Sequence, residues 1–325
     1  MTMNRIFNNI WRLAPTMVVL LAVLLASACS QTLQGGIETD KRAKNVIVFI
    51  GDGMGFNHED AASCFATGEK DNLTHQKLPV SLAMSTWAAG GSYDPAMMWE
   101  HFNNLNKGST DSAAAGTAMA TGRKTYGGAI GVGPDKQRLI NVVEWAETKG
   151  KSTGVVSSVE FAHATPAAFV AHNEKRHNFE DIAKEMLGQS AVDVLIGCGH
   201  PMYDNSGIKR KEANYKFVGG EATWKKRTAG ELGADADGDG VADPWSFYDN
   251  PETLLELPTK NLPKRIALIP PVFTTLQQRR EGDPEAAPFE VGYTKNVPML
   301  HQLTGLALEA LGRDEDGFFL MVEGG

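Results

Sequence analysis

The sequence has few cysteines, no basic excess and only a short apolar run, and each shortage excludes a class of protein. Three cysteines in 325 residues are too few for a fold held together by disulfides. The formal net charge of −8, from 31 Lys and Arg against 39 Asp and Glu, argues against general nucleic-acid binding. The apolar run 17–25 is shorter than the ~20 residues of a membrane-spanning helix.

The remaining composition is that of a globular protein. Hydrophobic residues make up 42% of the chain and charged residues 22%, which are ordinary values for a folded domain. The length suits one large domain or two smaller ones, so a sizeable core can be buried.

The N-terminus has the form of an export signal, residues 1–28. Arg5 and Arg12 precede the apolar run, and small residues then lead to Cys29. The ending "ASAC" resembles a bacterial lipoprotein signal, so we predict lipidation of Cys29, with ordinary cleavage as the alternative. Residues 29–44 then form a polar tether. We expect an exported protein of the periplasm or outer envelope, held at the membrane by the lipid.

Two cysteines, Cys64 and Cys198, remain after the signal. Export would permit a disulfide between them. Because they are isolated and distant in sequence, the alternative is two buried thiols that act as small hydrophobic side chains.

Short apolar segments alternate with helical patterns along the chain. The apolar segments are 46–50, 153–159, 192–197, 265–270 and 317–325, and the first of them ends in a Gly-rich turn. Helical patterns cover 139–150, 178–188 and 298–312. This alternation predicts an α/β fold with a mostly parallel central sheet and helices on both faces. We expect the first strand to be buried on both faces. The polar segment 201–262 is interpreted as an insertion rather than a second core.

Three polar residues follow predicted strands. Asp52 comes after the first strand, Thr165 after the second, and Glu323 lies at the end of the last. Ligands of parallel α/β sheets bind beyond the carboxyl ends of the strands. These residues are therefore candidate ligand-binding residues, and ordinary loop polarity is the alternative.

The segment around Ser112 predicts a helix of small residues. Residues 113–121 favour a helix, and Gly122 is a natural stop. Ser112 then lies in the first turn, where free N–H groups and the helix dipole favour an anion. Asp111 could simply cap this helix.

Four separated segments together resemble one family. "DSAAAGTAMATGRKTYGGAIGV" is similar to the nucleophile segment of the alkaline phosphatases, and "VIVFIGDGMG" resembles their first metal-binding strand. "ATPAAFVAHNEKR" resembles the segment that ends in their phosphate-binding arginine, and "FFLMVEGG" their magnesium-binding strand. The segments occur in the family's order between residues 45 and 325, which implies an alkaline phosphatase-like catalytic domain.

The resemblance implies catalytic roles for three residues. Ser112 would be the nucleophile that becomes phosphorylated. Arg176 would hold two phosphate oxygens, and Asp111 would hold the guanidinium of Arg176. A planar guanidinium matches two oxygens in a way that lysine does not.

The resemblance also implies a metal centre with two zinc ions and one magnesium ion. Asp52 would bridge a zinc and the magnesium, and Ser112 would be a zinc ligand. Thr165 and Glu323 would complete the magnesium ligands from the protein, which are hard oxygens as magnesium prefers. His163 would tune the magnesium site without binding directly, so we expect an altered metal preference.

The family's later zinc ligands have no counterpart in this sequence. Asp52 and Ser112 alone cannot hold zinc in a closed tetrahedral site, and the remaining histidines form no evident ligand pair and are expected mostly at the surface. We therefore expect an incomplete sequence of a longer enzyme, inactive in this form.

An acidic segment, 235–243, resembles part of a calcium-binding loop. Gly240 stands at the position of the sharp turn, but the twelfth position is Ser246 instead of glutamate. The candidate calcium ligands are Asp235, Asp237, Asp239, Asp243 and the carbonyl of Val241. A solvated acidic loop is the alternative.

The expected function is hydrolysis of small-molecule phosphate monoesters through a phosphoserine intermediate. A phosphodiesterase or sulfatase-like hydrolase of the same superfamily is one alternative. A phosphate-binding lipoprotein without catalysis is another. Dimers are common in the family, so a homodimer is a further expectation.

Overall fold

The computed structural model describes residues 43–325, except 102, 105–108, 237–239, 251–261 and 288. The chain divides into two units, Met1–Ala43 and Lys44–Gly325. The predicted export signal, Cys29 and most of the tether lie outside the described residues. Among the helices within them, none is long and apolar enough to cross a membrane.

Six strands of the described residues form one sheet in the order β1-β8-β2-β3-β7-β6. Every neighbouring pair is parallel, as the alternating pattern predicts. The strands are β1 (Val46–Gly51), β2 (Ser152–Glu160), β3 (Val194–Cys198), β6 (Ser246–Tyr248), β7 (Ile266–Leu268) and β8 (Phe318–Gly324). Five of them coincide with predicted apolar segments, and β6 was not predicted.

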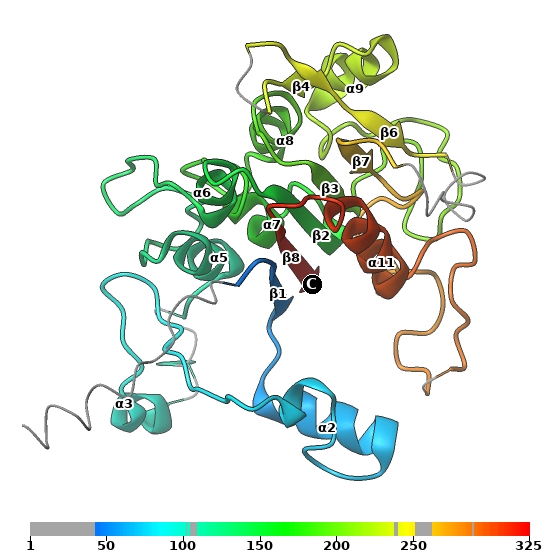
Figure 1. Cartoon of the computed structure of the whole chain (residues 1–325). Helices are drawn as coiled ribbons and strands as arrows, with labels where there is room; N and C mark the ends of the chain where they lie inside the picture. The colour runs from blue at the N-terminus through cyan, green and yellow to red at the C-terminus, as the bar shows by residue number, and fades with distance from the viewer. Residues whose placement is uncertain (1–42, 102, 105–108, 237–239, 251–261, 288) are drawn as a thin grey trace, which may run out of the picture. The chain divides into compact units, whose positions relative to one another are not determined.

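Helices cover both faces of this sheet (Figure 1). On one face lie α5 (Ser112–Thr121), α6 (Val142–Glu147), α7 (Ala164–Ala168) and α8 (Phe179–Gly188); on the other lies α11 (Leu300–Leu311). The alternation of side chains along a strand divides the core accordingly. Val155 and Leu195 belong to the cluster under α6 and α8, whereas the adjacent Val156 and Val194 pack with Leu303 of α11.

The ends of α5 and α6 follow directly from the sequence. Asp111 caps α5, since its carboxylate accepts the N–H of Ala114 at 3.0 Å, and Gly122 ends the helix with φ 72°. Asn141 and Glu144 form a reciprocal capping box at the start of α6. Asn178 precedes α8 but makes no side-chain cap.

The first strand differs from its prediction. β1 lies at the edge of the sheet and pairs only with β8. Val46, Ile47 and Phe49 are exposed by 41%, 40% and 69%. The expectation that β1 is buried on both faces is therefore wrong for the described residues, because an apolar run reports side-chain character and not the position of a strand in the sheet.

The described part of 201–262 extends the same sheet and forms no core of its own. It supplies β6 at the far edge, and Trp224 and Trp245 pack into the cluster under α8. Trp224 belongs to α9 (Gly220–Ala229). A small antiparallel pair, β4 (Gly233–Ala234) and β5 (Asp243–Pro244), also lies here.

The region between β1 and α5 contains α2 (Phe56–Thr67), a single 3-10 turn (His75–Lys77) and α3 (Pro95–Glu100). Cys64 in α2 is exposed, Cys198 is buried, and both thiols are free. A disulfide is therefore not formed, and the alternative of buried thiols holds for Cys198 alone.

Candidate active site

Ser112 is the first residue of α5, and its hydroxyl is held by a residue sixty positions earlier. Ser112 Oγ donates a hydrogen bond to Asp52 Oδ2 at 2.7 Å. Asp52 follows β1, and its N–H donates to the carbonyl of Gly324 at 3.0 Å. The parallel pairing of β1 and β8 thus fixes Asp52 beside the end of β8 and the N-terminus of α5.

Glu323 is fully buried at the carboxyl end of β8. In the sheet register it stands between Ile50 of β1 and Ser157 of β2. Ser157 Oγ donates to Glu323 Oε2 at 2.5 Å. Burial raises the pKa of Glu323 and the negative charge of Asp52 adds to this rise, while the hydroxyls of Ser157 and Thr165 act against it.

His163 immediately precedes α7, and Thr165 lies in its first turn, 2% exposed. One ring nitrogen of His163, Nε2, lies 3.2 Å from a guanidinium nitrogen of Arg176. Burial above all, and then the positive charge of Arg176, lower the pKa of His163 to about 4. The imidazole is therefore neutral at physiological pH and keeps a lone pair for a ligand.

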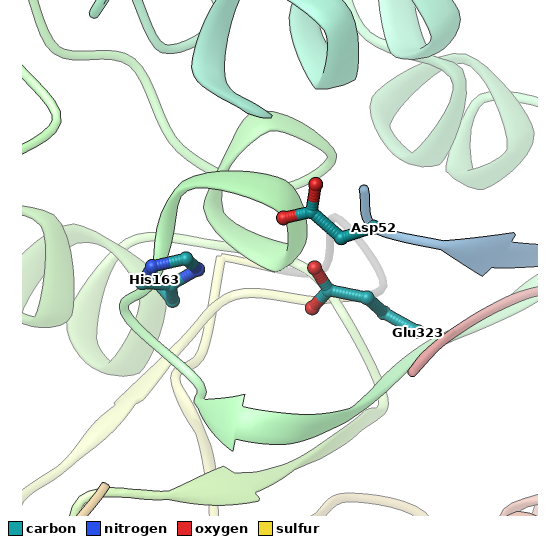
Figure 2. Close-up of side chains that lie close together, drawn as sticks. All are labelled: Asp52, His163 and Glu323. Carbon is teal, nitrogen blue, oxygen red and sulfur yellow. The ribbon is translucent and has the colours of Figure 1, made fainter. Parts of the chain in front are cut away.

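Asp52, His163 and Glu323 form a cluster whose potential ligand atoms all lie within 4.8 Å of one another. Figure 2 shows the two carboxylates and the imidazole directed toward the same space from three separate segments. Among the described residues this is the one group of three or more such side chains that could hold a metal ion. That His163 tunes the magnesium site without binding the ion stays a prediction.

Two atoms of this cluster indicate a missing partner. Among the residues that the structure describes, Glu323 Oε1 and His163 Nδ1 are buried without a hydrogen-bond partner. An unsatisfied buried polar atom costs roughly 1–3 kcal/mol. Two carboxylates and the nearby hydroxyl of Thr165 offer the oxygen ligands that magnesium prefers, and a neutral imidazole lies beside them. The residues present therefore fit the predicted magnesium ion.

Asp111 has two roles in the structure, and both were predicted. One carboxylate oxygen caps α5, and the other accepts from Arg176 Nη1 at 3.0 Å. The N–H of Gly128 donates to both oxygens. Burial by itself raises the pKa of Asp111, but the hydrogen bonds from Ala114, Gly128 and Arg176 outweigh it and hold the pKa below the usual value. The pair therefore stays charged at neutral pH.

A cavity of about 730 Å³ unites these groups. Its wall contains most of the predicted site residues, and the structure therefore brings them to one place: Asp52, Asp111, Ser112, Thr165 and Arg176. The contribution of Ser157 was missed, although the serine pair near the end of the second predicted strand was a visible signal.

The acidic loop is only partly described. Asp237 and Asp239 lie outside the described residues. Gly240 has φ 83°, as a sharp turn requires, and its N–H donates to Asp235 Oδ2 at 2.9 Å. Asp243 accepts from the N–H of Ala236 at 3.0 Å. Calcium binding by Asp235, Asp243 and the carbonyl of Val241 stays a prediction.

Two histidines differ from the expected surface position. His200 is 4% exposed and packs edge-on against Tyr203 and Trp224. Burial lowers its pKa to about 4. His172 is held by Glu185 at 2.9 Å and by the carbonyl of Leu139 at 2.8 Å. Both therefore have structural contacts away from the cavity.

The fold and the cluster define a class, the α/β proteins that bind ligands at the carboxyl edge of a parallel sheet. Comparison with known proteins then gives the family. A model of the alkaline phosphatase family matches residues 43–325. The chain belongs to the alkaline phosphatase family.

Two curated relatives come from Bacillus subtilis (strain 168). Alkaline phosphatase 3 is 30% identical over 330 residues, covering 95% of this chain and 59% of the relative. Alkaline phosphatase 4 is 31% identical over 324 residues, covering 96% and 58%. The chain thus spans somewhat more than half the length of these relatives.

Solved structures agree with the fold. A cold-active alkaline phosphatase from a psychrophilic Shewanella species matches with a TM-score of 0.58 and 28% identity, over 86% of this chain and 56% of that one. The alkaline phosphatase of the Antarctic bacterium TAB5 matches with a TM-score of 0.58 and 25% identity, over 87% and 66%.

Proposed function

We propose that this site hydrolyses phosphate monoesters through a phosphoserine intermediate at Ser112. The observation that carries the proposal is the 2.7 Å hydrogen bond from Ser112 Oγ to Asp52, in the same cavity as Arg176. Ser112 stands at the N-terminus of a ten-residue helix, where N–H groups and the helix dipole favour a phosphate. The names of the relatives support the same class of reaction.

The side chains divide the work of the proposed reaction. Ser112 Oγ loses its proton along its hydrogen bond to Asp52 and bonds to phosphorus as the bond from phosphorus to the alcohol oxygen breaks; the departing alkoxide takes up a proton and leaves as the alcohol. Water then hydrolyses the phosphoserine, which releases phosphate and restores the Ser112 hydroxyl. Arg176 binds two of the phosphate oxygens and orients them. Asp111, kept charged by its lowered pKa, holds Arg176 in place.

The metal cluster completes the proposal. We assign magnesium to Asp52, Thr165 and Glu323, with His163 beside it. A divalent ion bound here would stabilise negative charge on the oxygens that react. A variant of the TAB5 enzyme, which shares the fold, is described with Mg bound in its M3 site.

Two zinc ions are also part of the proposal, with Asp52 and Ser112 as ligands from this chain. A closed zinc site needs about four ligands. Among the described residues, Asp52, His163 and Glu323 are the one group of three or more such side chains that could hold a metal ion. We therefore propose that zinc needs further ligands. The sequence predicts that this chain is inactive, and we propose instead that it turns over substrate slowly, because Ser112, Arg176 and the magnesium ligands are present.

The test measures hydrolysis of a chromogenic phosphate monoester by the 325-residue chain with Mg²⁺ and Zn²⁺. We expect slow turnover that requires Mg²⁺ and disappears in Ser112→Ala, with phosphate mapped to Ser112 after rapid quenching. Full-length alkaline phosphatase 3 of Bacillus subtilis is the positive control. Equal turnover by the chain and by Ser112→Ala would contradict the proposal.

The alternatives give different results in the same assay. A preference for a phosphodiester or a sulfate ester over the monoester would favour another hydrolase of the superfamily. Phosphate binding without Ser112-dependent turnover would favour a phosphate-binding lipoprotein. Asp111 holds Arg176 and directly precedes Ser112 in the chain. This arrangement favours a phosphate monoester as the substrate.

Export, lipidation at Cys29 and a homodimer are further proposals based on the sequence and the family. Labelling with a fatty acid that is lost in Cys29→Ser, together with cell fractionation, tests the first two. The mass of the purified protein in solution tests the third.

A further inference from the structure

The cavity that contains Ser112 has an apolar part that the proposed reaction does not use. Apart from the proposed site residues, much of its wall is formed by the turn after β1, by the segment 84–88 and by α5. The apolar side chains with large surfaces are Met54, Met84, Trp87 and Met119. The cavity thus continues from the site of phosphate binding along an apolar wall.

One face of α5 forms part of this wall. The opposite face is buried against α7, where a side chain at Gly116 would approach Ala168 within 3.1 Å. Ala115, Ala118 and Met119 are spaced at helical intervals and line the cavity instead. Because two of these three side chains are single methyl groups, a ligand can lie close to the helix.

Trp87 is fixed in this wall by several contacts. Lys124 Nζ lies 4.6 Å from the centre of its ring and donates to its carbonyl. Tyr93 packs edge-on against the ring at 6.0 Å, and its hydroxyl accepts the N–H of Thr110 at 3.1 Å. The wall is therefore attached to the loop that leads directly into Asp111 and Ser112.

We propose that this apolar wall binds the alcohol part of the substrate and that the preferred substrates are phosphate monoesters of aromatic or other apolar alcohols. The inference rests on the proposed function. Ser85, Thr86 and Lys124 also line the cavity, but most of its lining is apolar. A sugar alcohol would therefore place part of its hydroxyl groups against methionine and alanine side chains without hydrogen-bond partners, which is unfavourable. An aromatic ring that packs against Trp87 and the methionines removes its apolar surface from solvent, which is favourable.

The test compares the binding of phenylphosphonate and methylphosphonate to the 325-residue chain with Mg²⁺ and Zn²⁺, by calorimetry. Both probes resist hydrolysis, so slow turnover does not affect the result. A pH above the second ionisation of both probes gives them the same charge. We expect phenylphosphonate to bind about tenfold more tightly, because an open cavity buries part of the ring.

The matched variants are Trp87→Ala and Trp145→Ala. Trp145 is 56% exposed on α6 and also carries a lysine, Lys149, over its ring, but it does not line the cavity. We expect Trp87→Ala to lose the preference for the phenyl group and to bind methylphosphonate as before, which also shows that it folds. Trp145→Ala should keep the preference, and Trp87→Phe should retain most of it.

The outcomes separate this inference from the proposed function. Equal affinity for the two phosphonates overturns the inference and leaves the phosphate site standing. A phenyl preference that survives in Trp87→Ala also overturns it. If neither phosphonate nor inorganic phosphate binds, the phosphate site itself fails and the inference fails with it.

Discussion

Both ends of the central sheet bury ionisable groups, but they differ in whether the polar atoms of those groups have hydrogen-bond partners. At the amino ends of the strands, Glu147, Asp193 and Arg265 form a buried group. At the carboxyl ends, the buried Glu323 lies beside the half-buried His163 and the exposed Asp52. Both contain groups with shifted pKa values, so a shift alone does not distinguish a structural cluster from a functional one.

The amino-end group is internally complete. Arg265 is 2% exposed and packs over the ring of Trp245. Its guanidinium donates hydrogen bonds to four backbone carbonyls, those of Ser190, Val192, Ala234 and Asp243. Asp193 accepts a hydrogen bond from the N–H of Thr153 at 2.9 Å, and Glu147 accepts a hydrogen bond from the hydroxyl of Thr153.

The carboxyl-end group is incomplete by the same measure. Glu323 Oε1 and His163 Nδ1 are buried without partners among the described residues, and both belong to the cluster of potential metal ligands. The difference teaches that buried atoms without partners in a group of potential metal ligands, more than burial or charge, distinguish the proposed functional end of this sheet.

The largest expected effect is on stability and comes from Arg265→Met. Removal of the guanidinium leaves four carbonyls and the carboxylate of Asp193 without their buried cation, so we expect a loss of about 3–5 kcal/mol in the free energy of unfolding. Urea denaturation measures it. Arg227→Met is the matched control, since Arg227 also lies over a tryptophan and pairs with Asp249 but is 18% exposed. A loss below about 1 kcal/mol for Arg265→Met would contradict the account.

The next effect is on binding, at the opposite end. Arg176→Ala should weaken phosphate binding by about 1.5–3 kcal/mol, the range for hydrogen bonds to a charged group, with little change in stability. Arg176→Lys should recover only part of the affinity, because an ammonium does not contact two oxygens in one plane. Calorimetry with inorganic phosphate gives both values. Unchanged affinity in Arg176→Ala would show that phosphate binds elsewhere.

The smallest effect is a pH dependence at the amino end. Burial, together with Asp193, raises the pKa of Glu147 from 4.5 to about 8. The folded state therefore keeps a proton that the unfolded state has lost over this range, so stability falls as pH rises from about 5 to about 8. Glu147→Gln should remove most of this fall, and Asp193, whose pKa burial raises to about 6, should leave a smaller fall at lower pH. Parallel curves for variant and wild type in urea titrations would contradict the assignment.

Much of the fold was predictable because apolar runs and helical periodicity alternate clearly. The strand ends carrying Asp52 and Glu323 were predicted to share one edge of the sheet, and the structure confirms it. The helix after Asp111 was predicted with its cap and its glycine stop, and both are confirmed. At these positions the residue that suits the local strand or helix end is also the residue that suits the overall fold, so the local pattern is informative.

Other features depend on packing that a single sequence does not encode locally. β6 has three residues within a polar segment, so its pattern is too short to detect. Side chains of β1 are exposed because this strand lies at the edge of the sheet. Its position there is set by pairing with a strand that is distant in sequence. Ser157 lies in an apolar run, and only the register between β2 and β8 places its hydroxyl on Glu323.

Thermal unfolding with and without Mg²⁺ tests the central claim most directly. The account predicts that Mg²⁺ raises the melting temperature of the wild type and of Glu147→Gln, but not that of Glu323→Gln. Without Mg²⁺, Glu323→Gln should be at least as stable as the wild type, because it removes a buried carboxylate with an unsatisfied oxygen. An equal rise in Glu323→Gln, or no rise in the wild type, would contradict the claim that the unpartnered oxygen of Glu323 is a metal ligand.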